Sequence, residues 1–115
     1  VNSDLLSRFE TIVDEYLHGP RLAVDGLPNV KWCAGQLCLS ANYFSDLIKK
    51  ETGKTAKEHI QNKIIELAKS RLLLPDKTIS QISYELGFQY PQHFTRLFKN
   101  AVGITPNEFR NRTEI

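Results

Sequence analysis

The sequence of 115 residues contains no methionine and no low-complexity tract, and no apolar run approaches the roughly 20 residues that a membrane-spanning helix needs. Because 41% of its residues are hydrophobic and 24% are charged, both disorder and membrane insertion are disfavoured. The sequence starts at Val1 without the basic and then apolar pattern of a signal peptide. We expect a soluble, cytoplasmic globular domain cut from a longer chain, with no membrane partner.

Cysteine is scarce, and common enzyme motifs are absent. Cys33 and Cys38 lie five positions apart, without C-x-x-C spacing or clustered histidines, which argues against a disulfide framework and a zinc site. The sequence also lacks H-E-x-x-H, G-x-S-x-G, a glycine-rich phosphate loop and a Cys/His pair at catalytic spacing. It therefore predicts a protein that is not an enzyme and needs no cofactor or metal. The two thiols are expected to be buried, in a reducing cytosol.

The formal net charge is only +2, but it is unevenly distributed along the chain. Residues 1–29 contain two bases and five acids, whereas the remainder contains 13 bases and eight acids. The first segment therefore carries −3 and the rest +5. A basic region permits a polyanionic partner without requiring one, because surface charge governs association more than fold.

Apolar residues recur every three or four positions over most of the chain, and no strand-like alternation is present, which predicts an all-α fold. A first helix is expected to end before Gly19, and its apolar stripe consists of Leu5, Leu6, Phe9, Ile12, Val13, Tyr16 and Leu17. Residues 21–29 are expected to form a loop, because Asp25-Gly26 and Leu27-Pro28 are turn-forming pairs.

The second half of the chain repeats the first. At an offset of 49, the aligned pairs are Val30/Ile79, Cys33/Ile82, Ala34/Ser83, Leu37/Leu86 and Leu39/Phe88. At an offset of 50, they are Phe44/Phe94, Leu47/Leu97, Ile48/Phe98, Lys49/Lys99, Gly53/Gly103, Thr55/Thr105 and Glu58/Glu108. One residue has therefore been inserted in a turn, and the structural unit is duplicated.

Each copy is predicted to form a short helix, a turn and a second helix that ends at a glycine, which is a helix-turn-helix unit. The capping boxes are Thr55 with Glu58, Thr78 with Gln81 and Thr105 with Glu108. A helix over residues 56–74, roughly 28 Å long, links the units. We expect a single domain of about seven helices. Its segments are a leading helix and loop (1–29), the first unit (30–53), the linker helix (55–74), the second unit (78–102) and a closing helix (106–112).

Two such units joined by one helix resemble the C-terminal DNA-binding domain of the AraC/XylS family of bacterial transcriptional regulators. The resemblance covers about residues 30–112. It is most specific at Ile79-x-x-Ile82-Ser83-x-x-Leu86-Gly87-Phe88, Phe94-x-x-x-Phe98-Lys99, Gly103 and Thr105-Pro106-x-x-x-Arg110. It implies sequence-specific binding of double-stranded promoter DNA, by a regulator that is more often an activator contacting RNA polymerase. It also implies that the regulator's own N-terminal sensor domain lay before Val1.

A helical wheel separates a polar face from the apolar face of each second helix. In the second copy, the expected apolar residues are Phe94, Leu97, Phe98 and Ala101. The family places the second recognition helix over residues 91–102. The predicted DNA-binding residues are Ser40, Asn42, Tyr43, Ser45, Asp46 and Lys49 in the first copy and Gln89, Gln92, His93, Thr95, Arg96 and Lys99 in the second.

These residue types suit nucleic-acid chemistry in the second copy better than in the first. Arg96 is the type that pairs bidentately with guanine, Gln92 the type that pairs with adenine, and Lys99 suits a phosphate. Asp46 would repel a phosphate and at best accept from a cytosine amino group, so the first copy is expected to contribute differently. Ser40 is expected to cap its helix.

Other interpretations stay open at this point. The polar faces could be solvated helix surfaces, and paired helices also stack into protein-interaction scaffolds, although two copies are few for a solenoid. Trp32 either packs under the first helix or is an exposed aromatic, and packing is favoured. Cys38 stands where the second copy has Gly87, so either a positive φ there would carry strain or the turn must differ from that of the second copy.

Overall fold

The computed structural model describes residues 2–113, which form eight α-helices and no strand. The helices are α1 (Asn2–Leu17), α2 (Arg21–Asp25), α3 (Val30–Gln36), α4 (Ala41–Thr52), α5 (Ala56–Leu72), α6 (Ile79–Glu85), α7 (Pro91–Val102) and α8 (Pro106–Thr113). The predicted all-α class, with two helix-turn-helix units joined by a long helix, is confirmed. Within the same residues, no helix combines the length and the apolar character needed to cross a bilayer.

The expected loop over residues 21–29 is wrong in its first part, because α2 occupies Arg21–Asp25. Leu22 is buried in the core, and the Arg21 Nε donates to the Asp25 Oδ2 across one helical turn at 3.2 Å. Gly26, at a φ of 82°, ends the helix. Five residues are too few to show helical periodicity, so only the tertiary burial of Leu22 marks α2, and it brings the helix count to eight.

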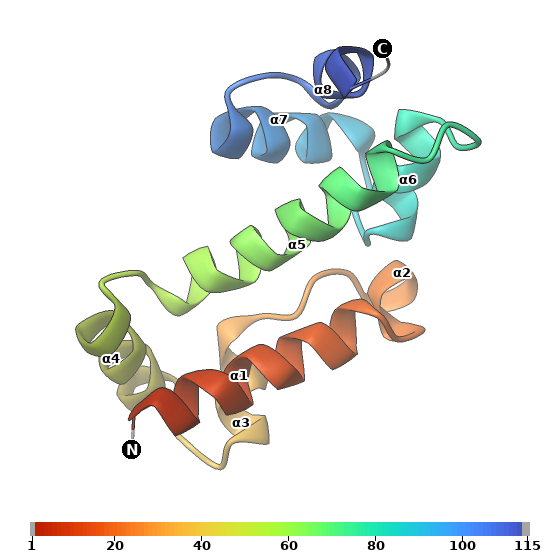
Figure 1. Cartoon of the computed structure of the whole chain (residues 1–115). Coiled ribbons are helices and arrows are strands. Elements are labelled where there is room, and N and C mark those ends of the chain that lie inside the picture. Colours follow the sequence, from red (N-terminus) through yellow and green to blue (C-terminus); the bar gives the residue numbers. More distant parts are fainter. Residues whose placement is uncertain (1, 114–115) are drawn as a thin grey trace.

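Helix α5 crosses the molecule diagonally and connects the two units (Figure 1). The first unit, α3 and α4, lies near its beginning, and the second unit, α6 and α7, lies towards its end. Helix α1 runs along one side of α5, whereas α7 and α8 lie on the other side. Helix α5 ends at Leu72, two residues before the predicted end, because Pro75 disfavours helical backbone at the residue before it.

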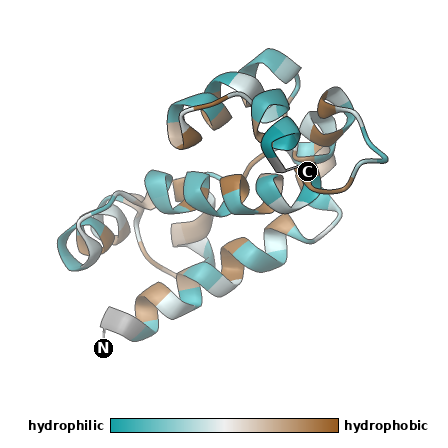
Figure 2. Cartoon of the chain, turned by 45° about the horizontal axis from the view of Figure 1, so that its top comes forward, coloured by the Kyte–Doolittle hydropathy of each residue, from teal (hydrophilic) through white to brown (hydrophobic). Residues whose placement is uncertain are grey.

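The apolar stripe of α1 packs into the core, as predicted. Phe9 is 1% exposed, and its ring meets that of Phe44 edge-on at 4.9 Å between centroids. Figure 2 shows the alternating brown and teal bands of a helix with one apolar face along α1. The predicted packing of Trp32 is confirmed, since its ring lies 5.0 Å from that of Tyr16 and the Arg21 guanidinium covers both rings.

Arg110 fixes the end of α5 to α8. Its guanidinium donates to three backbone carbonyl oxygens, those of Leu72 at 3.0 Å, Leu74 at 3.1 Å and Lys77 at 2.8 Å. The last carbonyls of a helix have no partner within the helix, so the guanidinium supplies a donor to that of Leu72, the last residue of α5, and two further donors to the segment that follows. Arg110 therefore orders the segment that enters the second unit.

The turns of the two units have the same backbone hydrogen bonds. In the first, the Cys38 N–H donates to the Gly35 O and the Leu39 N–H to the Ala34 O. The second repeats both bonds around Gly87, which is the pattern of a Schellman motif with a left-handed residue after the helix. Cys38 has a φ of 60°, so of the two alternatives left by the sequence the strained turn is present.

The expectation of two buried thiols is wrong for Cys38, which is exposed, whereas Cys33 is buried. The positive φ places Cys38 in the turn after α3, outside the core in which Cys33 lies. Burial raises the pKa of the Cys33 thiol to about 11, so this thiol is protonated at neutral pH and is a packing residue.

Replacing Cys38 with glycine is expected to stabilise the domain. A left-handed backbone costs a residue with a Cβ roughly 1–2 kcal/mol, and the extra freedom of glycine in the unfolded chain offsets roughly half of the gain. We therefore expect Cys38→Gly to raise the free energy of unfolding by about 0.5–1 kcal/mol in a urea titration followed by circular dichroism. Cys38→Ala is the control for loss of the thiol, and a glycine variant no more stable than the alanine variant would contradict the explanation.

Candidate nucleic-acid interface

Helices α4 and α7 are structurally equivalent and have 12 residues each. Over ten consecutive positions, residues 41–50 and 91–100, the sequence of buried, half-buried and exposed side chains is identical. Each helix then ends at a left-handed glycine, Gly53 or Gly103, whose N–H donates to the carbonyl of a lysine four residues earlier. The two copies inferred from the sequence therefore also pack alike, and equivalent positions of α4 and α7 are exposed to solvent.

The structure places most of the predicted DNA-binding residues on these exposed faces. The exposed residues are Ser40, Asn42, Tyr43, Asp46, Lys49, Gln89, Gln92, His93, Arg96 and Lys99. Ser45 and Thr95 are half-buried at the edge of each face. Gln89 occupies the turn that is one residue longer in the second copy.

In α7, Gln92, Arg96 and Lys99 lie opposite the buried rings of Phe94 and Phe98. Pro91 begins the helix, and the His93 ring lies edge-on to that of Tyr90, at 5.4 Å between centroids. Neither Arg96 nor Lys99 forms an ion pair with any described residue. Both cations are therefore free to meet an external anion.

The prediction that Ala101 belongs to the buried apolar face of α7 is wrong, because Ala101 is exposed. It borders a hollow of about 220 Å³ between α5 and α7, together with Leu97 and Asn100. Because Ala101 borders this open space, its position on the apolar side of the wheel does not lead to burial.

In α4, Asn42, Asp46 and Lys49 lie on the corresponding face. The Ser40 Oγ accepts a hydrogen bond from the Tyr43 N–H at 3.2 Å, which confirms its predicted role as the helix cap. The Lys49 Nζ donates to the Gly53 carbonyl oxygen at 3.0 Å, which holds its ammonium at the end of the helix. This face therefore carries one acid at its centre and a base at its edge.

A family profile described as a helix-turn-helix domain matches residues 33–112 of the chain. The chain belongs to the AraC/XylS family. It is an AraC-type helix-turn-helix DNA-binding domain of a transcriptional regulator. The match begins at Cys33 and therefore includes α4, α5 and α7.

Relatives of this AraC-type domain include the uncharacterized transcriptional regulatory protein YesN of Bacillus subtilis, at 29% identity over 113 residues. The aligned part is 96% of this chain and 29% of YesN. The uncharacterized regulator YtdP of the same organism is 29% identical over 97% of this chain, which spans 14% of YtdP. The AraC-type domain thus corresponds to a minor part of both relatives.

Solved structures share the fold. The C-terminal domain of the two-component response regulator yesN from Fusobacterium nucleatum superposes with a TM-score of 0.78 at 25% identity, over 96% of this chain and 99% of that one. The DNA-binding domain of the global transcriptional factor AdpA, solved in complex with a target DNA, has a TM-score of 0.70 at 20% identity. That comparison covers 91% of both chains.

The exposed faces of the AraC-type domain also contain two residues that the sequence analysis did not select. Lys50 and Asn100 are exposed at equivalent positions. They follow Asp46 and Arg96 by four residues, so they lie one helical turn further along the same face. The i, i+4 spacing was the signal that could have found them.

Carboxylates elsewhere in the AraC-type domain neutralise other bases. Among the described residues, the bases in ion pairs are Arg21, Lys63, Lys69, Arg71 and Lys77. None of these lies on α4 or α7. The bases on the exposed faces, Lys49 and Lys50 on α4 and Arg96 and Lys99 on α7, therefore form no ion pair with any described residue.

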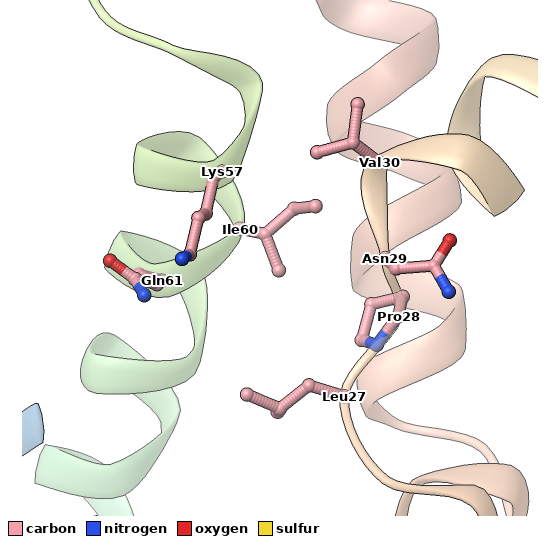
Figure 3. A pocket seen from close by; sticks show the side chains of 7 residues that line it. All are labelled: Leu27, Pro28, Asn29, Val30, Lys57, Ile60 and Gln61. Carbon is pink, nitrogen blue, oxygen red and sulfur yellow. The ribbon is translucent and has the colours of Figure 1, made fainter. Parts of the chain in front are cut away.

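A hollow of about 330 Å³ lies between residues 27–30 and the first half of α5 (Figure 3). Leu27 and Ile60 point into it from opposite sides, and Lys57 and Gln61 lie on its α5 side. Its walls are mainly apolar, and it is separate from the exposed faces of α4 and α7. Among the described residues, no group of three or more His, Cys, Asp or Glu side chains is placed to hold a metal ion.

Proposed function

We propose that this domain binds double-stranded promoter DNA in a sequence-specific manner, through the exposed faces of α4 and α7. The observation that carries the proposal is the identical burial pattern of residues 41–50 and 91–100, which presents two equivalent polar helix faces. A recognition helix is expected to place such a face against base edges in the major groove. The AdpA domain, which has this fold and was solved with a target DNA, supports the same use.

Within α7, we assign base reading to Gln92 and Arg96 and phosphate contact to Lys99. Arginine matches the two acceptors of guanine, and the glutamine amide matches the donor and acceptor of adenine. In α4, Asn42 stands beside Asp46, so weaker sequence discrimination is expected there. Helix α5 has 17 residues and is therefore about 26 Å long. Together with the width of the helices that it joins, this suits two major-groove segments about 34 Å apart on one face of the duplex.

We further propose that the domain acts within a longer cytoplasmic protein. In that protein, an N-terminal sensor domain would receive the signal, and the DNA-bound domain would activate transcription through contact with RNA polymerase. The support is that the regulators to which it is similar are much longer than this chain, which spans 29% of YesN and 14% of YtdP.

Arg96→Ala is expected to weaken binding to the preferred duplex by about 1–3 kcal/mol and to relax base choice at one position. Lys99→Ala should instead weaken all sequences similarly, because a phosphate contact carries no sequence information. The preferred duplex is selected from a random pool, and affinities for it and for a scrambled duplex are measured by fluorescence anisotropy.

The duplication offers a matched control for this test. Asp46 occupies the position in α4 that Arg96 occupies in α7, so Asp46→Ala alters the equivalent exposed site by the same truncation. It is expected to leave affinity unchanged or to improve it, since a carboxylate near phosphates is repulsive. A folded Arg96→Ala variant with undiminished affinity for the preferred duplex would refute the assignment. Failure of the unaltered chain to bind any duplex at low salt would refute the proposed function and favour a protein-interaction module.

A further inference from the structure

Four lysines surround the corner where α4 ends and α5 begins. We call them the corner lysines: Lys49, Lys50, Lys54 and Lys57. All four side chains are exposed. The equivalent positions of the second unit are Lys99, Asn100, Ile104 and Asn107, so three of these charges belong to the first unit alone.

A hydrogen bond places the Lys49 side chain beside the backbone that leads to Lys54. The Lys49 ammonium is held at the Gly53 carbonyl, directly before Lys54. Lys49 and Lys54 also contribute to lowering the pKa of the Glu58 carboxyl, although the main cause is the hydrogen bond from the Thr55 backbone N–H. The corner is therefore continuous with the edge of the exposed face of α4.

The acids nearby form no ion pair with the corner lysines among the described residues, and they are three against four bases. The Glu58 Oε1 accepts from the Thr55 N–H at 3.1 Å within the capping box, and no corner lysine has a carboxylate within ion-pair distance among the described residues. Asp46 and Glu51 on α4 are exposed and likewise form no ion pair within those residues. The corner thus retains an excess of positive charge.

The helix dipole does not favour a base at this place. Lys57 lies in the first turn of α5, where the helix dipole is positive and an acid would be the stabilising choice. Figure 3 shows its side chain beside Gln61 on the α5 side of the apolar hollow. A cluster of like charges at the positive end of a helix is unfavourable in the free protein and becomes favourable when an anion is bound.

We propose that the corner lysines bind the DNA phosphate backbone without reading sequence, and so anchor the first unit while α7 supplies most of the base discrimination. This inference rests on the proposed function. It accounts for the difference between the two copies, since the face with the weaker base readers, Asn42 and Asp46, has the more basic corner. Each phosphate neutralised by a lysine releases condensed counterions, so the contribution should appear in the salt dependence of binding.

The test replaces Lys54 and Lys57 with glutamine, because both lie outside α4 and neither change alters its exposed face. Lys54→Gln/Lys57→Gln is expected to weaken binding about tenfold at physiological salt, and to reduce the slope of log Kd against log salt by about 1–2. The loss should be equal on the preferred duplex and on a scrambled one. Lys69→Gln/Lys77→Gln is the matched control, because it removes the same charge from ion-paired positions and should leave both quantities nearly unchanged.

Thermal unfolding of both double variants establishes that they are folded. If the unaltered chain binds its selected duplex and Lys54→Gln/Lys57→Gln matches the control in affinity and slope, the inference is overturned while the proposed function stands. A loss confined to the preferred duplex would also overturn it, because the lysines would then affect sequence reading. Absence of duplex binding by the unaltered chain would overturn both.

Discussion

Gly87→Ala is expected to lower the free energy of unfolding by about 2–5 kcal/mol, the sum of backbone strain and overpacking. Gly87 has a φ of 89°, and a Cβ added there would lie 2.5 Å from the Leu22 carbonyl oxygen and 2.9 Å from the Gly26 Cα. Both obstructing atoms belong to the backbone, so they cannot move aside as the end of a flexible side chain would. Urea unfolding at equilibrium measures the loss.

Alanine substitutions at two other left-handed glycines measure the cost of backbone strain without the steric overlap expected at Gly87. Gly53 and Gly103 have φ values of 79° and 96°, and an added Cβ would meet no atom within 4 Å at either position. Alanine at either position should therefore cost only about 1–2 kcal/mol, from the backbone alone. Cys38 shows that the turn tolerates a Cβ where space is open. If Gly87→Ala is as stable as Gly53→Ala and Gly103→Ala, α2 moves away from the added Cβ without loss of stability, and the explanation is wrong.

The close approach at Gly87 also has a consequence for the interface. It joins α2 and Gly26 directly to the turn of the second unit, in addition to the connection through α5. The orientation of α7 relative to α4 thus depends on two contacts that are distant in the sequence. A variant that forces α2 away is expected to lose duplex affinity as well as stability.

Arg110→Ala is expected to lower the free energy of unfolding by about 2–4 kcal/mol. A hydrogen bond from a charged group contributes about 1.5–3 kcal/mol, and the three bonds of one side chain are not additive. The change would leave the carbonyls of Leu72, Leu74 and Lys77 without their guanidinium donor. Because these carbonyls border the entry to α6, the second unit should unfold before the first.

Arg110→Lys is the informative comparison for this site. It keeps the charge, but an ammonium lacks the planar fork that reaches three acceptors in different directions. We expect Arg110→Lys to recover less than half of the stability lost in Arg110→Ala. Hydrogen exchange of the α6 amides reports the local loss, and full recovery with lysine would show that charge alone, rather than the fork, holds the end of α5.

Features decided within one or two helical turns could be predicted from the sequence. The capping boxes at Thr55 and Thr78 form with both reciprocal hydrogen bonds. The span of α7, residues 91–102, is the one that the family resemblance implied. The self-alignment predicted equivalent exposed faces on α4 and α7 because the same spacing of apolar residues buries the same side of each helix. At Cys38, which aligns with Gly87, the sequence left a strained turn and a different turn as alternatives, and the φ of 60° decides for the strained one.

Features that depend on distant neighbours were decided only by the tertiary structure. Helix α2 forms although its five residues are too few to show helical periodicity, because Leu22 finds a place in the core. Ala101 has an apolar position on the wheel but stays exposed, because it borders the hollow between α5 and α7. Lys77 and Lys57 are both ordinary lysines in the sequence. The fold alone brings Glu85 to Lys77 and leaves Lys57 without an ion pair among the described residues, and that difference determines which charges remain for a polyanion.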